Sequence, residues 1–163
     1  MIRSLLAALA LFAAATTSAL AAPDCTADER VALSAYRALA EEHLSGILAS
    51  ERAIAATTDA QGANWARIKP ALASLARDVT TEAAVWYAMP DGRYYTVDGD
   101  QNKESLKDRA YFPTLLAGKP VNGALVISKS TGHRSIIVAT PVVNDGKVVA
   151  FIGVSVRPRL PAA

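Results

Sequence analysis

The spacing of hydrophobic residues divides the chain into three parts. An unbroken apolar run, residues 5–15, lies close to the start. A long stretch with apolar residues at steps of three and four follows, which predicts helix. From Glu82 onward apolar and polar residues alternate at steps of two, which predicts strands. The chain therefore has a helical first part and a strand-rich second part, as in an α+β domain.

The first 21 residues have the pattern of a secretory signal peptide. Arg3 precedes the apolar run, and Ala19-Leu20-Ala21 fits the A-x-A site of signal peptidase. Cleavage after Ala21 is preferred, because a cut one residue later would place Pro23 directly behind the cleaved bond. The alternative is a retained anchor, but the run is Ala-rich and short against the roughly 20 strongly apolar residues that a span needs. We expect a periplasmic or secreted protein whose residues 22–163 form a single domain.

A long first helix is predicted to begin at Thr26. Thr26 and Glu29 have the spacing of a capping box, in which each side chain bonds the backbone amide of the other residue. Apolar residues behind this cap recur at helical spacing, and the alanine-rich composition also favours helix. The helix is expected to end near Ala56. Its expected buried face consists of Leu33, Tyr36, Ala40, Leu44, Ile47 and Ile54.

A second helix is predicted to follow, with Asn64 as its cap. Pro70 lies inside the helical pattern and lacks a backbone donor, so this helix either kinks there or begins near Lys69. Its expected buried stripe is Ile68, Leu72 and Leu75.

Five strands are predicted after the helices, at residues 83–89, 93–97, 121–128, 135–143 and 147–156. The first two form a hairpin around Pro90-Asp91-Gly92, in which glycine supplies the positive φ. The last three are joined by two hairpin-type connections, residues 129–133 and the turn Asn144-Asp145-Gly146. An antiparallel meander of this kind needs one covered face, and the two helices would cover it.

Charge and cysteine content exclude several classes of protein. The formal charge of the whole chain is +2, and it falls to +1 when Arg3 leaves with the signal peptide. No basic stripe remains, which argues against binding to nucleic acid or to an anionic membrane surface. Cys25 is the single cysteine, so it is either incidental or pairs between chains. His43 and His133 have no third ligand at a useful spacing, so neither a metal site nor a cofactor is expected.

The segment Asp108-Arg109-Ala110-Tyr111-Phe112 carries the clearest chemical signal. It places a guanidinium and aromatic rings at the edge of the predicted sheet, a combination that suits a small anionic ligand. With the long helix, the hairpin at residues 90–92, the runs 115–118 and 128–132 and the closing strand 148–156, it resembles the Cache family of extracytoplasmic sensor domains. The resemblance covers the whole mature chain and fits a single Cache module.

This resemblance implies a fold and a site. The fold would be a long N-terminal helix and a second helix packed on a five-stranded antiparallel, PAS-like sheet. Arg109 would hold the carboxylate of the ligand, and Tyr111 would supply a ring or hydroxyl beside it. Family members that recognise amines carry acidic residues where, by spacing from Arg109, this chain has Lys129 and Ser155. A second cation at Lys129 would favour a compact mono- or dicarboxylate over an amino acid.

Other side chains are weaker candidates for the same site. Ser155 and Thr140 could donate hydroxyl hydrogen bonds, and strand alternation selects Trp86 and Tyr95 as ring contacts. Each assignment has a plainer alternative. Arg109 could pair with Asp108 or Glu104 at the surface, Lys129 could be a solvated turn charge, and Tyr111 and Phe112 could simply pack against the sheet, as we prefer for Phe112.

The expected function is a stand-alone sensor that binds a small organic anion and serves a separate membrane receptor or kinase, for example in chemotaxis. The alternative is a protein–protein adaptor or dimerisation module, so the protein would be a monomer or a homodimer through its long helix. An enzyme is not expected. Ser128, Ser130 and His133 are close in sequence, but a hydrolase would need a nucleophile elbow and an orienting acid, and neither can be identified.

Overall fold

The computed structural model describes residues 26–99, 101–128 and 132–158. The predicted signal peptide, Cys25, Lys129 and Ser130 lie outside these residues. The elements in chain order are α1 (Ala27–Ala55), α2 (Thr58–Gln61), α3 (Trp65–Asp78), β1 (Ala83–Ala88), β2 (Tyr94–Thr96), α4 (Phe112–Leu116), β3 (Val121–Ile127), β4 (Arg134–Asn144) and β5 (Lys147–Val156).

The chain divides into two units, Met1–Ala35 and Tyr36–Ala163. Helix α1 begins in the first unit, with the predicted capping box: the Thr26 amide donates to Glu29 Oε2 at 2.6 Å and the Glu29 amide to Thr26 Oγ1 at 3.3 Å. All other described elements belong to the second unit. No helix within residues 26–99, 101–128 and 132–158 is long and apolar enough to cross a membrane.

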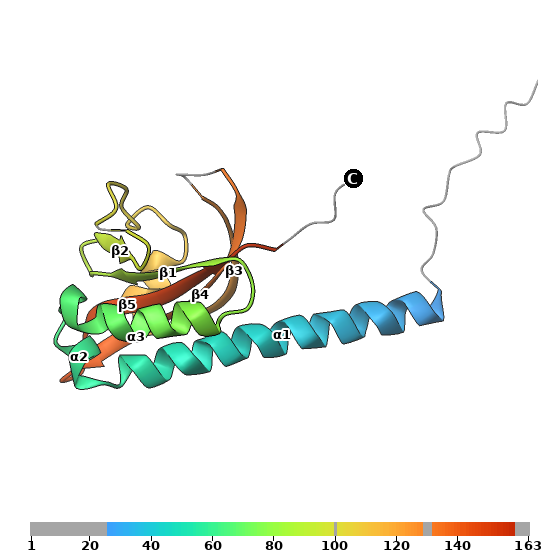
Figure 1. The fold of residues 1–163 in the computed structure, drawn as a ribbon. Helices are drawn as coiled ribbons and strands as arrows, with labels where there is room; N and C mark the ends of the chain where they lie inside the picture. Colours follow the sequence, from blue (N-terminus) through green and yellow to red (C-terminus); the bar gives the residue numbers. More distant parts are fainter. Residues whose placement is uncertain (1–25, 100, 129–131, 159–163) are drawn as a thin grey trace, which may run out of the picture. The chain divides into compact units, whose positions relative to one another are not determined.

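The five strands form one antiparallel sheet with the order β2-β1-β5-β4-β3 (Figure 1). The predicted hairpins β1–β2, β3–β4 and β4–β5 are present. The predicted meander is wrong, because β5 also pairs with β1 and so separates the two halves of the sheet. The α+β class and the five antiparallel strands are confirmed.

The buried part of α1 differs from the predicted stripe. Tyr36, in the second unit, is 73% exposed, so the expectation that it faces the core is wrong. The buried residues of α1 are Ile47, Leu48, Glu51 and Ala55. Helical spacing identifies an apolar face, but it does not say over which turns another element covers that face.

Helix α3 begins at Trp65, ahead of Pro70, so the alternative start near Lys69 is wrong. The side chain of Asn64 caps the helix by accepting from the Arg67 amide at 3.3 Å. The predicted buried stripe of Ile68, Leu72 and Leu75 is confirmed.

Both faces of the sheet carry apolar side chains. On the helix-side face, Val85, Tyr87, Val138, Ile152 and Val154 form one core cluster with residues of α1, α2 and α3. On the opposite face, a second cluster contains Trp86, Tyr111, Phe112, Leu115, Ile137 and Phe151. Phe112 is 1% exposed and meets Phe151 edge to face at 5.4 Å, which confirms its expected role in the core. This second face, behind α4 and the segment before it, holds the candidate site.

Candidate functional site

A cavity of about 190 Å³ opens on the face of the sheet away from the long helices. Its walls come from β1, β2, β3, β4 and β5 and from the segment between β2 and α4. Four of the predicted site residues line it together: Trp86, Arg109, Tyr111 and Ser155. The chain thus brings together side chains that are up to 69 residues apart.

Trp86 forms part of the cavity wall because β5 has a glycine opposite it. Trp86 pairs with Gly153 across the β1–β5 ladder. A Cβ atom at Gly153 would lie 2.1 to 2.4 Å from three atoms of the indole, so only glycine leaves room for the ring in this position. The indole Nε1–H donates to Ser155 Oγ at 3.0 Å. The ring is therefore held by packing on one side and by a hydrogen bond at its edge.

Arg109 projects into the same cavity from the segment before α4. Its Nη1 donates to the carbonyl of Ile127 at 3.0 Å, at the end of β3. No ion pair joins Arg109 to Asp108 or Glu104 within the described parts of the chain. Among the described residues, Arg109 thus makes one bond to a carbonyl and no contact with a carboxylate, and a guanidinium has five N–H donors.

Two phenols lie beside this guanidinium. Burial raises the pKa of Tyr111 to about 12, and the charge of Arg109 opposes the rise. Burial also raises the pKa of Tyr94, and Arg109 again opposes the shift while Glu104 adds to it. Both hydroxyls therefore stay protonated at neutral pH and can donate hydrogen bonds. Neither hydroxyl has a hydrogen-bond partner among residues 26–99, 101–128 and 132–158.

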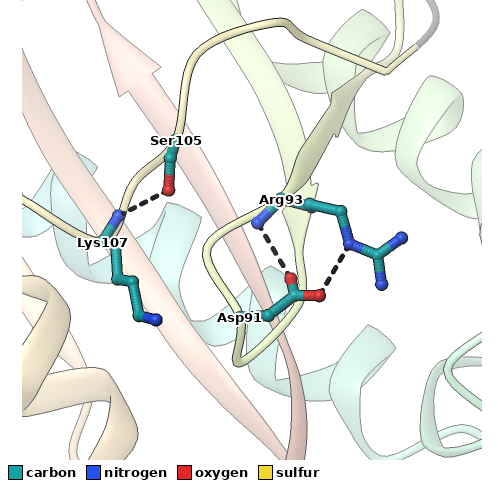
Figure 2. Close-up of polar contacts among 4 residues, drawn as sticks. All are labelled: Asp91, Arg93, Ser105 and Lys107. Carbon is teal, nitrogen blue, oxygen red and sulfur yellow. Dashed lines mark hydrogen bonds and ion pairs between the residues drawn. The ribbon is translucent and has the colours of Figure 1, made fainter.

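The segment that carries Glu104 and Arg109 is docked on the β1–β2 turn. The Leu106 amide donates to the Gly92 carbonyl at 2.9 Å, and Gly92 has a φ of +88°. A Cβ at Gly92 would lie 2.4 Å from Ser105 Oγ, so the close contact also requires glycine. Figure 2 shows Ser105 Oγ accepting from the Lys107 amide at 3.2 Å beside this turn.

Asp91 stabilises the same turn from the other side. Its carboxylate accepts from the Arg93 backbone amide at 3.0 Å and from Arg93 Nε at 2.6 Å (Figure 2). The hydrogen bond from the Arg93 backbone amide lowers the pKa of Asp91 most, and the guanidinium of Arg93 and the charge of Lys107 add to this against the opposing effect of burial. These bonds hold the turn on which the wall of the cavity is docked.

Two of the predicted site residues lie elsewhere. Tyr95 pairs with Tyr87 of the helix-side cluster and stacks on Trp65 at 5.2 Å, so it faces away from the cavity. Thr140 pairs with Ile152 and shares the helix-side face of β4 with Val138. Neither side chain is therefore among the residues that line this cavity. Tyr95 was selected by strand alternation, which gives two faces but does not say which face is which. Lys129 lies outside the described residues.

The cavity also contains residues that sequence reasoning missed. Tyr94 lines it in place of Tyr95, and the pairing of Ala88 with Tyr94 would have revealed this if the register had been known. Arg157 adds a second guanidinium, whose Nη1 lies 2.7 Å from Glu82 Oε1. Glu104 adds a carboxylate. No sequence signal pointed to Arg157 or Glu104, because each reaches the cavity through a loop or a strand end.

Of Ser128, Ser130 and His133, the cavity lining includes Ser128. His133 does not line the cavity, although its carbonyl accepts from the Ser128 amide at 2.8 Å. No group of three His, Cys, Asp or Glu side chains that could hold a metal occurs within the described residues. The main chemical feature of the cavity is a set of hydrogen-bond donors around two guanidinium groups and one carboxylate.

No protein-family model and no curated protein matches this chain. Several solved structures do. The sensory domain of the Campylobacter jejuni chemoreceptor Tlp3 with isoleucine bound is 12% identical, with a TM-score of 0.59 over 78% of this chain and 54% of that chain. A methyl-accepting chemotaxis protein X is 13% identical, with a TM-score of 0.58 over 78% of this chain and 61% of that chain.

The ligand-binding domain of the Pseudomonas aeruginosa PAO1 amino acid chemoreceptor PctC in complex with GABA is 15% identical, with a TM-score of 0.56 over 72% of this chain and 57% of that chain. The chain thus spans between about half and three fifths of the length of these sensory domains. At such identities the likeness concerns the fold. This chain has the fold of the Cache-type, PAS-like sensor domains that its sequence resembles.

Proposed function

We propose that this protein is a sensor domain that binds a small organic anion through a carboxylate group. The observation that carries the proposal is the convergence of the Arg109 guanidinium and the Tyr94 and Tyr111 hydroxyls on one cavity beside Trp86. A planar fork of donors matches the two oxygens of a carboxylate. The hydroxyl groups add neutral donors for the same oxygens.

The size of the cavity limits the ligand. Its volume of about 190 Å³ is below the roughly 300–1,000 Å³ of pockets that take drug-sized molecules. A compact acid with few heavy atoms fits this volume. The indole of Trp86 and the side chains of Leu106 and Ile137 would contact its apolar part.

An amino acid is a second candidate, because Glu104 provides a carboxylate that could hold an ammonium group. The expectation against amino acids considered only Lys129 and Ser155 and did not include Glu104. Isoleucine and GABA, which are bound to two of the similar structures, each carry both a carboxylate and an amine. The test therefore has to show whether the protein recognises the carboxylate of the ligand, its amine, or both.

We further propose that the protein acts outside the cytoplasm and reports its ligand state to a separate membrane receptor or kinase, without catalysis. Closure of the segment 107–118 over the ligand would shift the population of conformations and so change the surface of α1. A protein–protein adaptor without a small ligand remains the alternative function, and it predicts no response to any small molecule.

Tryptophan fluorescence provides the test. The chain has two tryptophans, so Trp65→Phe leaves Trp86 in the cavity wall as the only reporter. This variant would be titrated with propionate, succinate, isoleucine, GABA and butylamine. We expect the carboxylates to change the Trp86 emission in a saturable way and butylamine to have no effect. A response to butylamine alone would contradict the proposal, and silence with every probe would favour the adaptor.

Single variants test which side chain binds the carboxylate of the ligand and which binds its ammonium group. Arg109→Ala should abolish the response to carboxylates, whereas Arg37→Ala, which removes an exposed partner of Glu41 on α1, should leave it unchanged. Glu104→Gln should weaken binding of isoleucine and GABA but not of propionate if the amino-acid candidate is correct. A saturable response that survives Arg109→Ala at full strength would remove Arg109 from the site.

A further inference from the structure

Glu51 is a charged residue inside the apolar core. It lies on the same face of α1 as Ile47, Leu48 and Ala55, and its side chain is 0% exposed. Neither carboxyl oxygen has a hydrogen bond of standard length and angle among the described residues, although the Val154 amide lies near enough to act on the carboxyl group. A fully buried carboxylate without a partner is rare, because an ion loses its hydration on burial and only pairing or hydrogen bonding replaces it.

The groups around Glu51 do not supply that compensation. Burial raises the pKa of Glu51 well above its ordinary value, and the Val154 amide of β5 and the charge of Arg52 oppose this rise without cancelling it. Two charged residues of the neighbouring helices lie close to each other. Asp59 of α2 lies 4.0 Å from Arg67 of α3.

Two further titratable side chains on the neighbouring elements also have contacts of their own. Lys69 of α3 lies over the Trp65 ring at 5.6 Å. The Tyr87 hydroxyl of β1 donates to the Ala60 carbonyl at 2.9 Å and, with a pKa raised to about 12, stays neutral. Among the described residues, Arg52 is the charged group that acts on Glu51, and its charge does not cancel the effect of burial, so the neutral acid is the form that fits this position.

We propose that Glu51 is a proton-binding site that makes the packing of the C-terminal half of α1 on the sheet depend on pH. In the packed state Glu51 is a carboxylic acid that retains its proton. When this part of α1 opens and water reaches the side chain, the acid dissociates to a carboxylate and one proton passes to the solvent. Each opening event therefore releases one proton, and a higher pH favours opening.

The position of Glu51 connects this proton to the candidate ligand cavity. Glu51 approaches the Val154 amide of β5 from the helix side. The next residue, Ser155, lines the cavity on the other face of the same strand. A proton and a ligand would thus act on opposite faces of β5. The proton-linked opening itself does not depend on the proposed ligand.

Amide hydrogen exchange of the whole protein between pH 4.5 and 8 tests the proposal, with rates corrected for intrinsic exchange. In the wild type, protection factors of residues 47–55 should fall up to tenfold per pH unit between the ordinary carboxyl pKa and the raised value of Glu51. Glu51→Gln is neutral at every pH and should lose this slope. Glu42→Gln, an exposed carboxyl on the same helix, should keep it.

A wild-type slope in Glu51→Gln would overturn the proposal. If that variant does not fold, the 13Cδ chemical shift of Glu51 in the wild type decides the question instead. If the chemical shift of Glu51 changed over the same pH range as those of the exposed glutamates, the proposal would be contradicted. If it changed at a higher pH, together with the loss of amide protection in α1, the proposal would be supported.

Discussion

The indole Nε1–H of Trp86 donates to Ser155 Oγ at 3.0 Å across the β1–β5 pair. This bond fixes the ring over Gly153 and orients the hydroxyl of Ser155 at the cavity. Ser155 accepts from the indole, so its own proton is directed elsewhere and is available to an acceptor. The same contact therefore supports both the core of the sheet and the candidate binding site.

Gly153→Ala should destabilise the protein, because the new Cβ atom would overlap the Trp86 indole. Forcing one methyl group into a packed core costs about 1–3 kcal/mol. Urea unfolding would measure the change in free energy, and the Trp86 emission of the folded variant would report displacement of the ring.

The matched control is Gly46→Ala on α1, where an added Cβ meets no atom within 4 Å. A helical Gly→Ala change without a clash should stabilise by about 0.5–1 kcal/mol. If both variants were equally stable, the close contact of Trp86 with Gly153 would not exist in solution.

Ser155→Ala should remove the acceptor of a nearly buried indole N–H. Leaving such a donor unsatisfied costs about 1–3 kcal/mol. Trp86 is 3% exposed, so water has little access to replace the lost bond. Thermal unfolding should show a lower midpoint than for Ser50→Ala, which removes only an exposed bond to the Gly46 carbonyl. Equal midpoints would mean that the Trp86–Ser155 bond contributes nothing to stability.

Gly92→Ala should disturb the wall of the cavity. Gly92 combines a φ of +88° with a Ser105 Oγ that would lie 2.4 Å from a new Cβ. Gly92→Ala both strains the backbone and displaces the docked segment, so it should lower the free energy of unfolding more than a variant that only strains the backbone. Gly146→Ala is the control, because Gly146 has a φ of +74° with nothing within 4 Å.

The two glycine variants would be compared by urea unfolding and by the carboxylate response of Trp86. We expect Gly146→Ala to lose about 1 kcal/mol or slightly more and to bind normally, because only the backbone is strained. Gly92→Ala should lose more stability and bind more weakly. Normal binding by a destabilised Gly92→Ala would show that the turn does not position the cavity wall.

The buried phenols predict a loss of stability at alkaline pH. Burial raises the pKa of Tyr87 and of Tyr111 from 10.0 to about 12. The folded state therefore holds these protons longer than the unfolded state does. Their contribution is complete below pH 10 and is lost as the pH rises toward 12.

The double variant Tyr87→Phe, Tyr111→Phe should show a smaller loss of stability between pH 9 and 12 than the wild type, measured by urea midpoints. At neutral pH it should be less stable by about 1 kcal/mol, because the bond from Tyr87 to the Ala60 carbonyl is absent. Tyr36→Phe, at an exposed position, should behave like the wild type. A full wild-type slope in the double variant would contradict the raised pKa values.

Features that depend on neighbours in sequence were predicted well. The Thr26–Glu29 capping box, the Asn64 cap and the stripe of α3 follow from hydrogen bonds and spacing within a few residues. The hairpin turns at residues 90–92 and 144–146 follow from local φ preferences. The identity of Arg109 and Tyr111 as cavity residues came from a family resemblance in one short segment.

Features that depend on contacts between distant segments could not be predicted. The insertion of β5 between β1 and β4 and the register that places Tyr94 at the cavity arise from pairings across the sheet. The inclusion of Arg157 and Glu104 and the burial of Glu51 depend on which surfaces meet after folding. The sequence by itself determined the elements, because local periodicity and capping act along the chain. The tertiary structure decided which side chains share the cavity and which charge is buried, because strand register and helix coverage are set by packing between residues far apart in the sequence.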